Sequence, residues 1–76
     1  MSGIALYGKP KCTGCDNTER KLKREGLAYT KIDITQDADA YKYVTETLGY
    51  SAAPVVVTET KHWSGYRPDL IEEIER

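Results

Sequence analysis

Two cysteines three positions apart lie where a short apolar segment gives way to a helix-forming segment. Residues 4–7 suit a short strand, and the composition of residues 13–25 suits a helix that Gly26 would end. Cys12 then lies at the helix N-terminus and Cys15 one turn into the helix. Residues three apart on a helix bring their Cβ atoms to about 5–6 Å, so a disulfide can form after modest adjustment.

A purely structural role for this cysteine pair is improbable. The ring that a Cys12–Cys15 disulfide closes is so small that it removes little entropy from the unfolded chain. The N-terminus lacks the basic start and long apolar stretch of a signal peptide, so a reducing, cytoplasmic location is expected. A zinc site needs four ligands as a rule, whereas the chain offers two cysteines and a distant His62. No bound metal is expected, although a cluster shared between two chains stays an alternative.

The position of the pair favours redox chemistry instead. A helix N-terminus carries partial positive charge and unpaired N–H groups, which favour a thiolate at Cys12, and Lys9 and Lys11 flank it. We expect Cys12 to attack a substrate disulfide and Cys15 to resolve the mixed disulfide. A C-x-x-C beside a βαβ pattern in a cytosolic protein is typical of a thioredoxin-like redox motif. The only redox group expected is the Cys12–Cys15 disulfide, with no bound cofactor.

The middle of the chain predicts one strand and one helix. Residues 28–34 alternate between apolar and polar side chains, as a strand does. Residues 37–48 suit a helix, with Tyr41, Val44 and Leu48 on its buried face. A strand–helix–strand unit implies a parallel pair of strands with a right-handed crossover.

The last third predicts a hairpin and a final helix. Residues 55–58 and 62–64 are close enough in sequence to pair as antiparallel strands, and Pro68 suits the first position of a helix. The expected fold is therefore α/β, in the order βαβαββα. It has a four-stranded mixed sheet flanked by three helices, formed by one domain over residues 1–76.

Ala53-Pro54 stands directly before the third strand. A proline can begin a strand but cannot sit inside a central one, and an X–Pro bond can be cis. We predict a cis bond that faces the cysteines, so that the backbone of Ala53 can pair with an extended substrate. A trans proline that simply starts the strand is the alternative.

The segment from Trp63 to Asp69 combines Trp, Gly, Tyr and Arg in one strand–loop–helix start. Trp, Tyr and Arg are enriched at contact surfaces. The alternative is that Trp63 belongs to the core and the last three residues only begin a helix. His62 and Asp33 are expected at the surface, as is the cationic helix face formed by Arg20, Lys21, Lys23 and Arg24.

The charges are distributed unevenly along the chain. The net charge is −1, but residues 1–34 carry +3 and residues 35–76 carry −4. This balance gives no case for nucleic-acid binding, and no apolar run is long enough to span a membrane. The cysteines lie in the basic half, which would attract an acidic partner.

The whole chain resembles the NrdH-redoxins, glutaredoxin-like electron donors to class Ib ribonucleotide reductase. The most specific match is Trp63–Asp69, which looks like the family's W-S-G-F/Y-R-P-D signature. Glutathione-using glutaredoxins have a glycine pair and acidic residues there. One departure is Thr13-Gly14 between the cysteines, where the family usually has a larger residue and Gln. The other matching segments are Tyr7–Cys15, Gly26–Tyr29 with Asp33-Ile34, Leu48–Tyr50 and Ala53–Val57.

The resemblance implies a thioredoxin-like fold of the glutaredoxin type, and the protein is expected to be a monomer. It also implies electron transfer from NADPH through thioredoxin reductase to disulfides of the large subunit of class Ib ribonucleotide reductase. The alternatives are a glutathione-dependent glutaredoxin and a cluster-coordinating or adaptor module. Besides Cys12 and Cys15, the residues expected to contact substrate or partner are Lys9, Thr13, Ala53, Pro54, Trp63, Ser64, Gly65, Tyr66 and Arg67.

Overall fold

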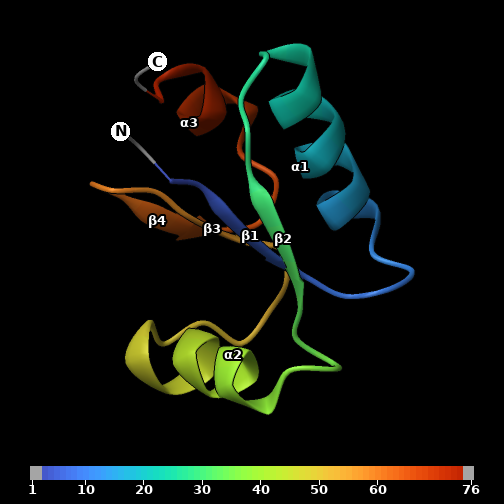
Figure 1. Ribbon diagram of the computed structural model, residues 1–76, viewed down its shortest axis with the longest axis vertical. Coiled ribbons are helices and arrows are strands. Elements are labelled where there is room, and N and C mark those ends of the chain that lie inside the picture. Colours follow the sequence, from blue (N-terminus) through green and yellow to red (C-terminus); the bar gives the residue numbers. More distant parts are fainter. Residues whose placement is uncertain (1–2, 75–76) are drawn as a thin grey trace.

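The computed structural model describes residues 3–74 and confirms the expected element order (Figure 1). A π-helical turn, η1, continues α2, and the predicted strand over residues 28–34 is shorter at both ends. The elements are β1 (Ala5–Gly8), α1 (Thr13–Arg24), β2 (Thr30–Asp33), α2 (Ala38–Lys42), η1 (Tyr43–Thr47), β3 (Val55–Val57), β4 (His62–Ser64) and α3 (Pro68–Glu72).

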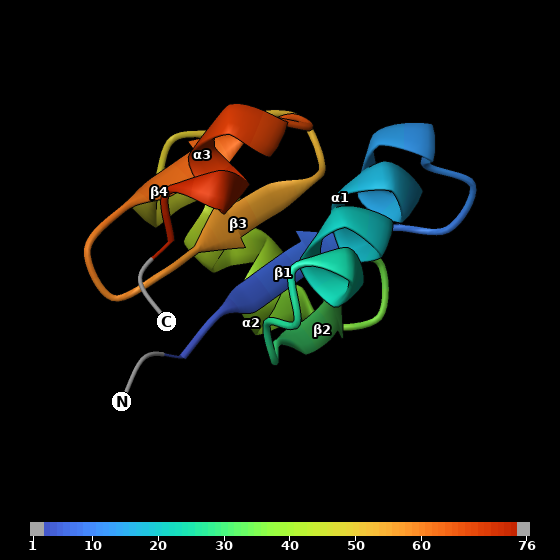
Figure 2. The ribbon, with the colours of Figure 1, turned by 90° about the horizontal axis from the view of Figure 1, so that it is seen from above.

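The four strands form one mixed sheet in the order β2-β1-β3-β4. β1 and β2 are parallel, as the βαβ pattern predicts, and β1–β3 and β3–β4 are antiparallel. α1 and α3 cover one face of the sheet and α2 covers the other (Figures 1 and 2). No helix within residues 3–74 is long and apolar enough to cross a membrane.

The main core lies between the sheet and the α1/α3 layer. α1 contributes Leu22, which is fully buried, and the C-terminal end of α1 is followed by Gly26 at a φ of 72°. The positive φ of Gly26 turns the chain back toward β2 at low steric cost. The buried cluster consists of Ile4, Leu6, Leu22, Val56, Trp63, Ile71 and Ile74.

The second helix differs from the sequence-based expectation. Val44 is buried as predicted and Leu48 is half-buried, but Tyr41 is 55% exposed, so its predicted burial is wrong. Ala40 takes the inward position instead, because a small side chain lets the helix lie close to the sheet. The following turn is widened, and the N–H of Leu48 donates to the carbonyl of Tyr43, five residues back, at 3.0 Å.

Candidate active site

Cys12 is the N-cap residue of α1, and it is joined to Cys15 by a disulfide with a Cα–Cα distance of 5.2 Å. The Cys12 Sγ accepts a hydrogen bond from the backbone N–H of Cys15 at 3.1 Å. An N–H group in this position, at a helix N-terminus, favours a thiolate on Cys12 once the disulfide is reduced. The local geometry therefore supplies what a nucleophilic thiol needs at this position.

Cys15 lies deeper than Cys12, with 3% of its surface exposed against 9%. It packs under the end of β1, where a Cβ on Gly8 would lie only 3.2 Å from the Cys15 Sγ. Gly8 therefore permits the close approach of strand and helix that places Cys15. The strand expected over residues 4–7 stopped short of Gly8, which ends β1 (Ala5–Gly8).

The bond between Ala53 and Pro54 is cis, as predicted. Pro54 is buried against the start of α1, and a Cβ on Gly14 would lie 3.1 Å from the Pro54 Cδ. Gly14 is thus the residue that lets the proline loop pack on the cysteine motif.

The backbone of Ala53 is available for pairing. Among residues 3–74, neither its N–H nor its carbonyl has a hydrogen-bond partner. The residues around it are held in place, because the Ser64 hydroxyl donates to the Ala52 carbonyl at 3.0 Å and the Gly65 N–H donates to the Pro54 carbonyl at 2.7 Å. These two bonds fix the proline loop to the segment after β4.

Trp63 is a core residue and not a contact residue. It is 5% exposed and packs in the main cluster, so the expectation that it lies on the contact surface is corrected. It occupies the middle of β4, and alternation along a strand turns it inward when His62 and Ser64 face outward. Its indole Nε1 has no hydrogen-bond partner among the described residues.

The loop after β4 holds two further predicted residues at the surface. Tyr66 is 40% exposed. Arg67 forms a two-point ion pair with Asp69, with Nη2–Oδ2 at 3.0 Å and Nε–Oδ1 at 3.2 Å. This pair lowers the pKa of Asp69 and commits the Arg67 guanidinium to its own loop. Gly65 adopts a φ of 89°, which a glycine tolerates at the bend.

Lys9 and Lys11 are both exposed in the loop before Cys12, as Thr13 is just after it. Neither lysine forms an ion pair within the described part of the chain. Lys11 has a φ of 57°, a conformation that costs a non-glycine residue about 1–2 kcal/mol. Nothing in the sequence marks this conformation, because no Gly or Asn stands there. It directs the chain into the Cys12 cap.

Two other polar residues have hydrogen-bond partners of their own. His62 is exposed, as expected, and its Nδ1 is 2.8 Å from the Tyr50 hydroxyl. Asp33 ends the edge strand β2 and accepts hydrogen bonds from the hydroxyl and N–H of Thr35, which lower its pKa. Asp33 is therefore engaged locally.

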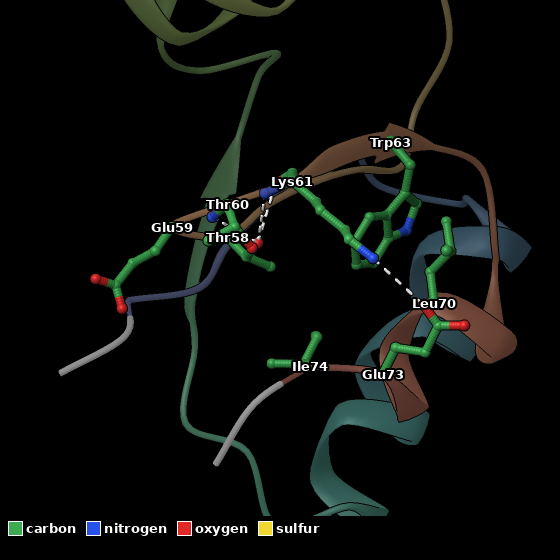
Figure 3. A pocket seen from close by; sticks show the side chains of 8 residues that line it. All are labelled: Thr58, Glu59, Thr60, Lys61, Trp63, Leu70, Glu73 and Ile74. Atoms are coloured by element: carbon green, nitrogen blue, oxygen red, sulfur yellow. Dashed lines mark hydrogen bonds and ion pairs between the residues drawn. The ribbon is translucent and has the colours of Figure 1, made fainter.

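One cavity lies away from the cysteines. It has a volume of about 460 Å³ and lies between the β3–β4 turn and α3, at the end of β3 away from Pro54 (Figure 3). Lys61 reaches across it to Glu73 at 3.3 Å. A second groove of about 260 Å³ borders the site, since Lys9 and Ala53 line one end of it and Tyr41 and Val44 line the other.

Comparisons with known proteins agree with this geometry. A glutaredoxin family model matches residues 4–63. The chain belongs to the glutaredoxin family. It is 38% identical over 72 residues to the Gene 56 protein of Mycobacterium phage L5, covering 93% of this chain and 70% of that one. It is 30% identical over 74 residues to the glutaredoxin-like protein NrdH of Salmonella typhimurium, covering 93% and 86%.

The fold comparison points to the same branch of the family. The structure of the glutaredoxin-like NrdH-redoxin from Escherichia coli, a protein with a thioredoxin-like activity profile, superposes with a TM-score of 0.92. The two chains are 27% identical, and the match covers 97% of this chain and 96% of the other. This glutaredoxin-family chain is an NrdH-like thiol–disulfide oxidoreductase, with Cys12 and Cys15 at disulfide distance.

Proposed function

We propose that this NrdH-like protein reduces protein disulfides in the cytoplasm with electrons from NADPH, delivered by thioredoxin reductase. The proposed acceptor is the large subunit of a class Ib ribonucleotide reductase. The observation that carries the proposal is the state of Arg67, which the Asp69 carboxylate engages at two points. A glutathione site needs cationic or polar donors for two carboxylates, and this guanidinium is already occupied.

The proposed reaction balances through two thiol exchanges. The Cys12 thiolate attacks one sulfur of the substrate disulfide, a mixed disulfide forms, and the other substrate sulfur leaves as a thiolate that takes up a proton. Cys15 then loses its proton and attacks Cys12, which releases the second substrate thiol and forms the Cys12–Cys15 disulfide. The substrate gains two electrons and two protons, and thioredoxin reductase restores the dithiol.

The free backbone of Ala53 supports a protein substrate. Its unpaired N–H and carbonyl can hydrogen-bond an extended segment laid beside Cys12, as an added strand does. The unpaired Lys9 and Lys11 would attract an acidic segment, by an attraction that salt weakens.

A glutathione-dependent glutaredoxin is the second candidate, and Lys9 favours it. This exposed cation lines the groove next to Ala53 and could hold one carboxylate of a tripeptide. The decisive experiment compares the reduction rate of the oxidised protein by thioredoxin reductase with the rate by glutathione and its reductase, at matched NADPH. We expect thioredoxin reductase to be faster. A faster glutathione system would reject the proposed reductant.

The roles of the cysteines are tested separately. Cys12→Ser should abolish disulfide reduction, whereas Cys15→Ser should retain the attack and accumulate a mixed disulfide. Alkylation of the reduced protein near neutral pH, followed by mass mapping, should label Cys12 first. Preferential labelling of Cys15 would reverse the assignment.

A further inference from the structure

A small hollow lies between the outer side of α1 and the loop after β4. Its volume is about 110 Å³, and we name it the α1–Tyr66 hollow. Tyr66 is one of only two large hydrophobic side chains that are exposed within residues 3–74. Exposed aromatic side chains beside arginines are typical of protein contact surfaces. The hollow is lined by Asn17, Arg20, Lys21, Arg24 and Tyr66.

The cations of the α1–Tyr66 hollow differ in their engagement. Lys21 is paired with Glu72 at 2.8 Å and Glu25 at 3.1 Å, and these carboxylates raise its pKa. Arg20 contacts only the Asn17 side chain, at 3.2 Å, and Arg24 has no partner among the described residues. Two guanidinium groups are therefore available for an external anion.

No carboxylate within residues 3–74 forms an ion pair with Arg20 or Arg24. Arg20 also borders the adjacent side of α1, where Asp16 and Glu19 lie. Glu19 is engaged by the Tyr29 hydroxyl at 2.6 Å and by Lys31 at 3.1 Å. No ion pair within residues 3–74 joins Arg20 to either carboxylate.

The α1–Tyr66 hollow lies within reach of the cysteines. The bond from the Gly65 N–H to the Pro54 carbonyl holds the Tyr66 loop beside the proline loop. At 1.5 Å of rise per residue, Arg20 and Arg24 lie about 12 and 18 Å along α1 from Cys12. A typical interface of about 800 Å² per partner spans such a distance, so one partner can cover both regions.

We propose that the α1–Tyr66 hollow is a docking surface for an acidic segment of the protein substrate. This inference rests on the proposed reduction of protein disulfides. Extended chain advances about 3.3 Å per residue, so the acidic residues would lie about four to six positions from the substrate's reactive cysteine. Arg20 and Arg24 bind their carboxylates, and Tyr66 packs against the intervening chain.

The test measures single-turnover reduction by pre-reduced protein, so no reductase is needed. Two synthetic disulfide peptides serve as substrates, identical except for three Glu or three Ser residues placed four to six positions from the cysteine. Each peptide is made in two forms, one with these three residues on the N-terminal side of the cysteine and one with them on its C-terminal side. Hydroxyethyl disulfide reports the chemistry of the cysteines alone. The variants are Arg20→Ala/Arg24→Ala, Tyr66→Ala and, as a control that removes one positive charge on α2, Lys42→Ala.

We expect the native protein to reduce the Glu peptide about fivefold faster than the Ser peptide at low salt, in one of the two placements. The double variant should lose this preference, with an unchanged rate on hydroxyethyl disulfide, and Tyr66→Ala should reduce the preference. Lys42→Ala should keep the preference. The proposal is overturned if the double variant keeps the preference, or if Lys42→Ala loses as much. A faster glutathione system would reject the proposed reductant without changing these peptide rates.

Discussion

The two faces of the sheet are built with different amounts of apolar packing. The face under α1 and α3 holds a contiguous cluster that includes Leu22, Trp63 and Ile71. The face under α2 holds fewer buried side chains, among them Ala40 and Val44, and it leaves a groove of about 260 Å³ beside the cysteine loop. The densely packed face positions the reactive cysteines, and the sparsely packed face leaves room next to them.

The largest expected effect is from Trp63→Ala on the densely packed face. Removing a buried Trp side chain costs about 3–5 kcal/mol, a large part of the roughly 4–11 kcal/mol expected for a domain of this size. Trp63→Phe is the control, because it keeps a ring and removes an indole N–H that has no hydrogen-bond partner within residues 3–74. Denaturant unfolding of the oxidised proteins measures both. A smaller loss of stability in Trp63→Ala than in Trp63→Phe would contradict the comparison of the two faces.

Gly8→Ala tests how tightly β1 packs on Cys15. The added Cβ would lie 3.2 Å from the Cys15 Sγ, and overpacking of this kind typically costs about 1–3 kcal/mol. We also expect slower resolution of mixed disulfides, measured in single-turnover exchange. Gly3→Ala is the matched control, since nothing lies within 4 Å of its Cβ. If Gly8→Ala and Gly3→Ala have the same stability and resolve mixed disulfides at the same rate, β1 does not pack tightly on Cys15 at Gly8.

Val44→Ala tests the sparsely packed face. Losing two buried methyl groups costs about 1.6 kcal/mol at roughly 0.8 kcal/mol per group, and the rate with a small disulfide should not change. Unfolding midpoints and hydroxyethyl disulfide reduction measure the two effects. A larger loss of stability in Val44→Ala than in Trp63→Ala would contradict the comparison of the two faces.

The smallest expected effect concerns Tyr29, which packs against the main core. Burial, together with the hydrogen bond that it donates to Glu19, raises the pKa of Tyr29 to about 12. A raised pKa means that the folded state holds this proton more tightly, so the associated stability is present below pH 10 and lost between about pH 10 and 12. Tyr29→Phe should show a smaller alkaline loss of stability over that range. Equal losses in the two proteins would reject this linkage.

The elements and the core of the site could be predicted because their signals are local. Cys12 as a helix cap, Gly26 after the helix and Pro54 before a strand each follow from residue type and spacing. Tyr41 was misplaced because an apolar pattern gives little weight to Ala40, although a small residue can define the inward side of a helix. The burial of Trp63 depended on tertiary packing, since composition alone fitted a contact surface equally well.

Other features of the site could not be read from the sequence. The left-handed conformation of Lys11 has no residue signal. The close approaches of Gly8 to Cys15 and of Gly14 to Pro54 join residues from different elements, so they exist only after the chain has folded. The pairing of Arg67 with Asp69 differs from these contacts, because the two residues stand two positions apart in the sequence.

The hydrogen bond from the Gly65 N–H to the Pro54 carbonyl joins the two ends of the β3–β4 hairpin. It closes residues 54–65, which contain the β3–β4 hairpin, into one continuous unit, whereas the reacting sulfurs belong to residues 12–15. The proposed partner contacts therefore come from two separate stretches of chain, this hairpin unit with its flanks and the segment from Lys9 to Arg24. Exchanging the hairpin unit between related proteins should change only the part of partner choice that depends on the backbone beside Pro54, while the thiol chemistry stays with the recipient.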